Sequence, residues 1–238
     1  MNVDAIIFDK DGTLIDFDAY WVAVSVKAIK DALKQLGKEE VPVLEILEAF
    51  GVHEGITDMN GALCKGTYAQ MGQIVHDILS RYGCESSCDE VKRIVIEAYN
   101  HNVDVGEVKP TCPDLPESLS QLKKQGKMLA VVTTDNEMIT CKCLKDLGIE
   151  ALFDKIYTDD NNVPTKPDPY CAFDFCKRFG VDRERVVMVG DTMTDITFAK
   201  NAGIKVIALA KSERNKQMLE PYADAVIPRI SSLLELLE

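Results

Sequence analysis

The hydrophobic pattern of this chain changes once, between Glu107 and Lys109, and this change constrains the fold more than any other feature. From Asp16 to Glu107 apolar residues recur at helical spacing, whereas from Lys109 onward short apolar runs alternate with helical stretches. The alternation is typical of a parallel α/β sheet, but this second region lacks a first strand, which residues 4–9 can supply. We therefore expect an α/β core that is interrupted early by a helical insert.

Four short apolar runs in the second region are candidate core strands. Each is preceded or followed by a helical stretch, and glycines mark the ends of these stretches. Asp168-Pro169 favours a helix start, because aspartate caps free backbone N–H groups and proline suits the first helical position. The candidate strands are Met128–Val132, Lys155–Tyr157, Val186–Val189 and Val206–Ala208.

The insert is expected to be a bundle of four main helices with a Gly-rich loop from Gly51 to Gly66. Two sets of apolar residues repeat at steps of four and three, as an amphipathic helix requires. Two segments, Thr67 to Gln70 and Ser87 to Glu90, fit the capping box at a helix start. The two apolar sets are Val22, Val26, Ile29, Leu33 and Leu36, and Tyr68, Met71, Val75, Ile78 and Tyr82.

Composition excludes several classes of partner. The net charge of -12 argues against nucleic acid, because binding to a phosphate backbone depends on clustered lysine and arginine. The N-terminal apolar run, Ala5 to Phe8, is too short for a secretory segment or a membrane span. We therefore expect no nucleic-acid or membrane partner and, by default, a cytoplasmic location.

The eight cysteines and three histidines do not form a zinc pattern. The close cysteine pairs do not repeat a CxxC spacing, and they fall inside apparent helices. Reduced structural thiols are therefore the favoured interpretation. The histidines are scattered along the chain.

Two aspartates, Asp9 and Asp11, follow the apolar run Ile6-Ile7-Phe8 and precede a turn at Gly12. An Asp-Gly turn alone would explain them, since this dipeptide commonly marks turns. Crowded carboxylates, however, also suit a cation or phosphoryl transfer. A carboxylate that attacks phosphorus needs a cation, donors for the phosphoryl oxygens and a second acid for the leaving group.

Groups that meet these needs occur where later strands should end. Thr133 and Thr134 follow one apolar run, Lys166 precedes a helix start, and Asp191 and Asp195 follow another run. Singly, each has an ordinary explanation as a strand-end hydroxyl, a loop lysine or an acidic helix start. Because the carboxyl ends of parallel strands share one edge of the sheet, all of them can converge with the first aspartate pair.

These segments, in this order, resemble the four motifs of the haloacid dehalogenase (HAD) superfamily. The DxDGT segment, the apolar run ending in threonine, the isolated lysine and the GDxxxD segment carry the resemblance. The chain is most similar to the phosphatase branch with a helical cap after the first motif, which includes phosphoglycolate phosphatases. The resemblance implies a Rossmann-like parallel-sheet core at residues 1–15 and 108–238 and an α-helical cap domain at residues 16–107.

The resemblance also implies roles for individual residues. Asp9 is expected to be the nucleophile that forms an aspartyl-phosphate, and Asp11 the general acid and then the general base. Mg²⁺ is the expected cofactor, bound by Asp9, Asp191 and the backbone carbonyl of Asp11. The phosphate-binding residues are expected to be Gly12, Thr133, Thr134 and Lys166.

Two further expectations concern neighbours of these residues. Asp195 lies one helical turn after Asp191 and is expected to support Lys166 or a metal-bound water. Lys10 is expected to point away from the aspartates, as alternation in a strand would require, and to have no chemical role.

The insert does not specify a substrate. Lys65 could meet a substrate anion and Tyr20 could line the pocket, although a solvated lysine and a core aromatic are the more ordinary interpretations. The predicted partner is a small-molecule phosphate ester. Phosphoglycolate is favoured by the resemblance alone, and sugar phosphates, nucleotides and pyrophosphate stay open.

Three alternatives use similar residues. A phosphomutase of the β-phosphoglucomutase type would share all four motifs, whereas a dehalogenase is disfavoured because its relatives carry a single aspartate where this chain also has Asp11. A response-regulator receiver, a phospho-aspartate signalling module, would need neither the helical insert nor Asp191. A catalytically idle binding protein would not need the intact set.

Overall fold

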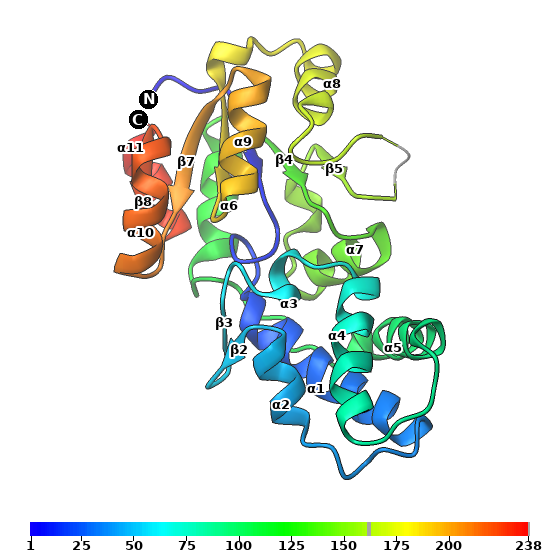
Figure 1. Cartoon of the computed structure of the whole chain (residues 1–238). Coiled ribbons are helices and arrows are strands. Elements are labelled where there is room, and N and C mark those ends of the chain that lie inside the picture. Colours follow the sequence, from blue (N-terminus) through cyan, green and yellow to red (C-terminus); the bar gives the residue numbers. More distant parts are fainter. Residues whose placement is uncertain (161–162, 238) are drawn as a thin grey trace. The chain divides into compact units, whose positions relative to one another are not determined.

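The chain divides into two units in the computed structural model, which describes residues 1–160 and 163–237 (Figure 1). One unit joins Met1–Asp16 to Val108–Glu238, and the other is the continuous segment Phe17–Glu107. The last residue of the predicted core, 238, lies outside the described residues.

The first unit contains a six-stranded sheet in which every neighbouring pair of strands is parallel. The strand order is β5-β4-β1-β6-β7-β8, so the first strand of the chain lies at the centre. This confirms the α/β class, and the predicted strands are present within one residue at each end. The strands are β1 (Ala5–Phe8), β4 (Met128–Val132), β5 (Lys155–Tyr157), β6 (Val186–Gly190), β7 (Lys205–Leu209) and β8 (Ala225–Ile227).

The strands of this sheet are apolar on both faces. In β6 every residue is buried, as expected of a parallel strand covered on both sides. Ile7 and Met188 belong to a cluster with residues of α8 and α9, whereas Ile6 and Val187 alternate to the opposite face and are also fully buried. The helices are α6 (Leu115–Lys124), α7 (Glu137–Asp146), α8 (Tyr170–Phe179), α9 (Met193–Ala202), α10 (Glu213–Leu219) and α11 (Leu233–Leu236), with 3-10 turns at Glu150–Leu152, Arg183–Arg185, Glu220–Tyr222 and Ile230–Ser232.

The start of α8 differs slightly from the prediction. The helix begins at Tyr170, and Pro169 occupies the capping position without a side-chain hydrogen bond. Asp168 still satisfies a free donor, because its Oδ1 accepts the Tyr170 N–H at 2.9 Å. The turn chemistry was therefore correct, but the helix begins one residue later.

The second unit is helical apart from one short hairpin. Its four main helices, α1, α2, α4 and α5, confirm the predicted bundle. The predicted Gly-rich loop contains the hairpin and a one-turn helix. The elements are α1 (Phe17–Gln35), α2 (Val43–Ala49), β2 (Val52–His53), β3 (Ile56–Thr57), α3 (Ala62–Lys65), α4 (Tyr68–Arg81), α5 (Cys88–Asn102) and the 3-10 turn Val103–Val105.

Two buried tyrosine hydroxyl groups of the helical unit, those of Tyr20 and Tyr99, are hydrogen-bonded within that unit. The Tyr99 hydroxyl donates to Ser25 Oγ at 2.8 Å, which links α5 to α1. Thr67 forms the predicted capping box with Gln70 at the start of α4. No helix within the described ranges is both long and apolar enough to cross a membrane.

Candidate active site

The site lies at the carboxyl end of the central strand. Phe8, the last residue of β1, is in register with Val131 on one side and Val189 on the other. The Asp9 N–H then donates to the Val189 carbonyl at 2.9 Å, which fixes the chain as it leaves the sheet. The loops after β1, β4 and β6 therefore begin side by side, as the sequence predicted for parallel strand ends.

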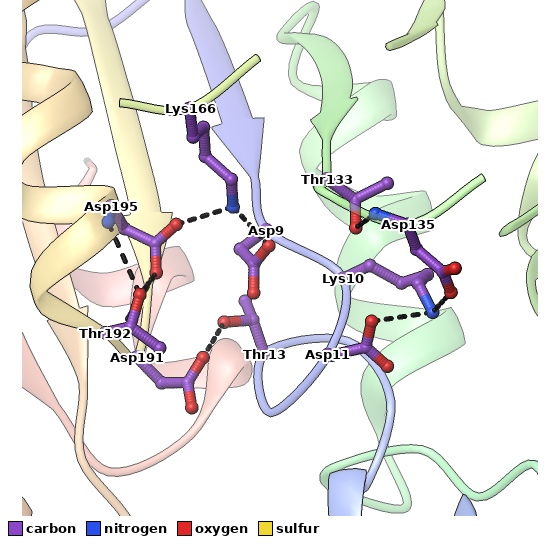
Figure 2. Close-up of polar contacts among 10 residues, drawn as sticks. All are labelled: Asp9, Lys10, Asp11, Thr13, Thr133, Asp135, Lys166, Asp191, Thr192 and Asp195. Atoms are coloured by element: carbon purple, nitrogen blue, oxygen red, sulfur yellow. Dashed lines mark hydrogen bonds and ion pairs between the residues drawn. The ribbon is translucent and has the colours of Figure 1, made fainter. Parts of the chain in front are cut away.

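Lys166 bridges two aspartates from different parts of the chain (Figure 2). Its Nζ donates to Oδ1 of Asp9 and, at 2.7 Å, to Oδ1 of Asp195. The lysine is 7% exposed and Asp195 is fully buried. Asp195 is itself held at the start of α9, where its Oδ2 accepts the Thr192 N–H at 3.0 Å and the Thr192 hydroxyl at 2.6 Å. These contacts leave Lys166 little freedom to move.

Asp191 lies against the turn that follows β1. Its Oδ1 accepts the Thr13 hydroxyl at 3.0 Å. Gly12 has φ +81°, and a Cβ at this position would overlap the Asp191 carboxylate. A Cβ at Gly190 would likewise overlap the Asp195 side chain. Both glycines are needed because the carboxylates approach the backbone so closely.

Three of these carboxylates could hold a metal ion. One oxygen each from Asp9, Asp191 and Asp195 lies within 4.8 Å of the others. Burial raises the pKa of Asp9 to about 7, against the opposing effect of Lys166. Burial, and then the neighbouring charges of Asp9 and Asp195, raise the pKa of Asp191 well above its ordinary value. A bound cation would offset this accumulated negative charge, so the residues fit a divalent metal.

The hydrogen bonds that the carboxylates accept also indicate which of them can bind a metal ion directly. Asp195 already accepts three hydrogen bonds, from Lys166 and Thr192. Asp9 and Asp191 are therefore the better direct ligands, and oxygen ligands suit Mg²⁺. Burial opposes the charge on Lys166, but Asp195 and Asp9 outweigh this effect and hold its pKa above the ordinary value. The lysine therefore stays cationic beside the carboxylates.

A second buried lysine lies beside this group. Lys10 is fully buried, and its Nζ is 2.7 Å from Oδ2 of Asp11 and 2.7 Å from Oδ2 of Asp135. Burial opposes its charge, but the two carboxylates hold its pKa above the ordinary value. The prediction that Lys10 points away from the aspartates is wrong, because β1 ends at Phe8 and strand alternation does not extend to Lys10. Figure 2 shows Asp11 turned toward Lys10.

The two threonines after β4 differ in exposure. Thr133 is 2% exposed, and its Oγ1 accepts the Asp135 N–H at 3.2 Å. Its hydroxyl can still donate to a ligand. Thr134 is exposed to solvent. Of the two predicted phosphate-binding threonines, Thr133 therefore has the better-defined position.

The two residues of the helical unit that were predicted as substrate contacts, Lys65 and Tyr20, have the contacts of a surface lysine and a core aromatic residue. Lys65 is exposed, and its Nζ donates to Oδ1 of Asn60 at 2.6 Å. Tyr20 is fully buried, donates its hydroxyl to the Val103 carbonyl at 2.6 Å and packs edge-on against Trp21. The structure therefore supports the core interpretation of Tyr20, not a role in lining a pocket.

Four residues of the site, Thr13, Thr192, Lys10 and Asp135, were not predicted as partners, although the first two carried a signal. Thr192 matches the capping-box pattern with Asp195, whose support of Lys166 was predicted, and Thr13 belongs to the DxDGT segment. Lys10 and Asp135 carried none, because their pairing depends on how the loops after β1 and β4 leave the sheet.

Comparison with known proteins agrees with this geometry. A family model described as a haloacid dehalogenase-like hydrolase matches residues 3–203. Pyrophosphatase PpaX of Bacillus velezensis is 29% identical over 238 residues, covering 99% of this chain and 96% of that protein. A phosphoglycolate phosphatase of Neisseria meningitidis is 30% identical over 204 residues, covering 85% of this chain and 78% of that protein.

A solved structure shows the same fold. A magnesium-bound HAD-hydrolase structure from Bacillus subtilis superposes with a TM-score of 0.70, covering 100% of both chains at 18% identity. The family match spans the helical insert and strands β1, β4, β5 and β6 of the sheet. Sequence, sheet order and strand-end residues thus agree that the chain belongs to the haloacid dehalogenase-like hydrolases, in the branch of phosphatases similar to phosphoglycolate phosphatase and PpaX.

Proposed function

We propose that the protein is a Mg²⁺-dependent phosphatase that hydrolyses a small phosphate ester through an aspartyl-phosphate on Asp9. The observation that carries this proposal is the contact of Lys166 with both Asp9 and Asp195 at the carboxyl end of β1, beside Asp191. The ammonium fixes the carboxylate of Asp9 and offsets part of its charge. That arrangement suits attack on an anionic phosphoryl group.

Asp9 and Asp11 divide the chemistry between them. An oxygen of Asp9 attacks phosphorus, the bond from phosphorus to the ester oxygen breaks, and Asp11 gives its proton to the departing oxygen. Water then attacks the aspartyl-phosphate and gives a proton to Asp11, while the bond from phosphorus to Asp9 breaks. Inorganic phosphate leaves, and Asp9 is regenerated.

The remaining residues bind and orient the phosphoryl group. The Thr133 hydroxyl, Lys166 and backbone N–H groups of the turn at Gly12 donate hydrogen bonds to its oxygens. Asp195 positions Lys166 through the 2.7 Å contact. Asp9, Asp191 and the Asp11 carbonyl would hold Mg²⁺, which would neutralise charge on the phosphoryl group when bound.

The relatives favour two substrates. A match over almost the whole length of PpaX favours pyrophosphate, and the match to phosphoglycolate phosphatase favours phosphoglycolate. The helical unit is proposed to be the cap domain that selects between such substrates. We expect a cytoplasmic enzyme that binds neither nucleic acid nor membrane.

Phosphate release tests this proposal. The panel contains phosphoglycolate, pyrophosphate, β-glucose 1-phosphate and a nucleoside monophosphate, each with Mg²⁺ or with EDTA. We expect turnover of at least one member with Mg²⁺ and none with EDTA. Asp9→Asn should abolish turnover, whereas Asp146→Asn, a change of the same chemistry on the exposed end of α7, should preserve it.

Three results separate the alternatives. Turnover in Asp9→Asn equal to the unmodified chain would contradict the covalent mechanism. Conversion of β-glucose 1-phosphate into glucose 6-phosphate, without phosphate release, would instead identify a phosphomutase. A receiver module would accept one phosphoryl group from acetyl phosphate and stop.

A further inference from the structure

We propose that Lys10, anchored by Asp135, is a positioning residue for Asp11. The inference rests on the proposed function, in which Asp11 transfers protons to and from the leaving group and water. Lys10 itself need not touch the substrate. Its role is to hold the Asp11 carboxylate in one orientation beside the nucleophile.

The contacts of Lys10 leave its ammonium group fixed. The side chain is fully buried, and Nζ lies 2.7 Å from a carboxylate oxygen of each aspartate. The Asp11 and Asp135 side chains are themselves only 19% and 11% exposed. A lysine normally has several rotatable bonds free in water, so this one is unusually well ordered.

Asp135 provides the anchor because it is tied to the end of β4. Its Oδ2 accepts from Lys10, its Oδ1 accepts the Asn136 N–H at 2.8 Å, and its own N–H donates to Thr133 Oγ1 at 3.2 Å. A continuous chain of contacts thus runs from the proposed phosphate-binding threonine to the proposed proton-transfer residue. Figure 2 shows this chain on the opposite side of Asp9 from Asp191.

Hydrogen bonds already fix the backbone around Asp11, so the contribution of Lys10 is limited to the Asp11 side chain. The Leu14 and Ile15 N–H groups both donate to the Lys10 carbonyl, at 2.8 and 3.0 Å, and close the turn. The remaining freedom of Asp11 is the rotation of its side chain. The ammonium of Lys10 restricts that rotation, and a fixed orientation favours proton transfer at a defined atom.

A buried ion pair is weak evidence that Lys10 serves only to stabilise the fold. Desolvation of the charges offsets much of their attraction, and apolar residues of similar size would fill the same space as well. The Lys10 pair ends on a residue of the site, whereas Lys123 in the same unit pairs with Asp154 at 2.7 Å on the surface, where both side chains are partly exposed. Lys123 therefore provides a matched control for replacing a paired lysine.

Substrates with different leaving groups distinguish positioning from simple structural support. An alkyl phosphate needs a proton as its leaving oxygen departs, whereas p-nitrophenyl phosphate releases a stable anion and needs it less. The ratio kcat/KM reports the steps up to departure of the leaving group. Loss of Asp11 positioning should therefore lower kcat/KM much more for the alkyl substrate.

The experiment compares Lys10→Met, Lys10→Arg, Asp135→Asn and the control Lys123→Met with both substrates. Lys10→Met should lower kcat/KM for the alkyl phosphate by about 10- to 100-fold, a part of the roughly 10²- to 10⁴-fold that acid–base catalysis contributes. The loss should fall mainly on kcat, with KM little changed. Lys10→Arg should restore part of the rate, and Lys123→Met should change neither substrate.

A double variant supplies the strictest outcome. In the Asp11→Asn background, Lys10→Met should cause no further loss, because the residue that it positions is already inactive. Equal losses for the two substrates, or losses that add to those of Asp11→Asn, would overturn the inference while leaving the phosphatase proposal standing. If Lys10→Met fails to fold, Asp135→Asn replaces it in the comparison of the two substrates and in the double variant. Absence of turnover in the unmodified chain would overturn both proposals.

Discussion

The interiors of the two units contain different kinds of polar group. Within the described residues, the charged side chains that are buried, Asp9, Lys10, Lys166 and Asp195, all belong to the α/β unit. The buried polar residues of the helical unit are neutral, namely Ser25 and Asn102.

This difference separates chemistry from packing. Buried charges destabilise a fold unless they are paired or serve a function, whereas neutral groups that are hydrogen-bonded internally are compatible with an apolar core. Changes in the α/β interior should therefore alter activity first. Changes in the helical interior should alter stability and leave the chemistry intact.

Among the changes that test this difference between the units, replacement of Lys166 should have the largest effect. Lys166→Met removes the donor to Asp9 and should lower kcat by about 10²- to 10³-fold, the usual result of losing one donor to developing charge. It also leaves buried carboxylates unpaired, which should lower the free energy of unfolding by about 3–5 kcal/mol. Kinetics and urea unfolding measure the two effects, and a variant with normal kcat would place the chemistry elsewhere.

Gly12→Ala should come next. The positive φ disfavours alanine by about 1–3 kcal/mol, and the new Cβ displaces the Asp191 carboxylate. Misplacement of a site group by about 1 Å can lower the rate by about 10²-fold. Mg²⁺ titration of activity should show a raised half-saturating concentration. Gly126→Ala, at φ +80° with no atom near the new Cβ, is the control for backbone strain alone.

Tyr99→Phe should change stability without changing chemistry. The substitution leaves the Ser25 hydroxyl without its donor in a buried position, at a cost of about 1–3 kcal/mol. The single tryptophan, Trp21, lies in the same unit, so its fluorescence during urea unfolding reports this loss. The double variant Tyr99→Phe with Ser25→Ala should recover part of it. A fall in kcat of the folded variant would contradict the assignment of stability to the helical interior and chemistry to the α/β interior.

Thr67→Ala should have the smallest effect. It removes the side-chain half of the capping box at α4, which should lower the free energy of unfolding by about 1 kcal/mol. Thr67→Ser retains the hydroxyl and should behave like the unmodified chain. Trp21 fluorescence is again the measurement, and identical unfolding curves for the two variants would show that the cap contributes nothing.

The convergence of distant site residues could be predicted where each residue directly follows an apolar strand. Asp9, Thr133 and Asp191 follow runs whose length and apolar character predict parallel strands, and parallel strands share one edge. Strand β8, Ala225–Ile227, was not predicted, although β5, an edge strand of the same length and burial pattern, was.

Local conformation accounts for the other differences. The hairpin at Val52–Thr57 turns through Glu54 and Gly55, both at positive φ, and Glu-Gly lacks the usual turn signal of Asn-Gly or Asp-Gly. The contact of Lys10 with Asp11 was missed because strand alternation was extended two residues beyond the end of β1. Side-chain direction outside regular elements depends on packing that sequence periodicity does not describe.

The central position of β1 has a consequence for synthesis of the chain. Ala5–Phe8 are synthesised before their partners in β4 and β6, which follow only after the whole of Phe17–Glu107. The helical unit is continuous in sequence and can complete its own contacts in the meantime. Until β4 and β6 are synthesised, this apolar strand therefore has two unpaired edges. Protection of that strand from premature pairing is a requirement of this insertion.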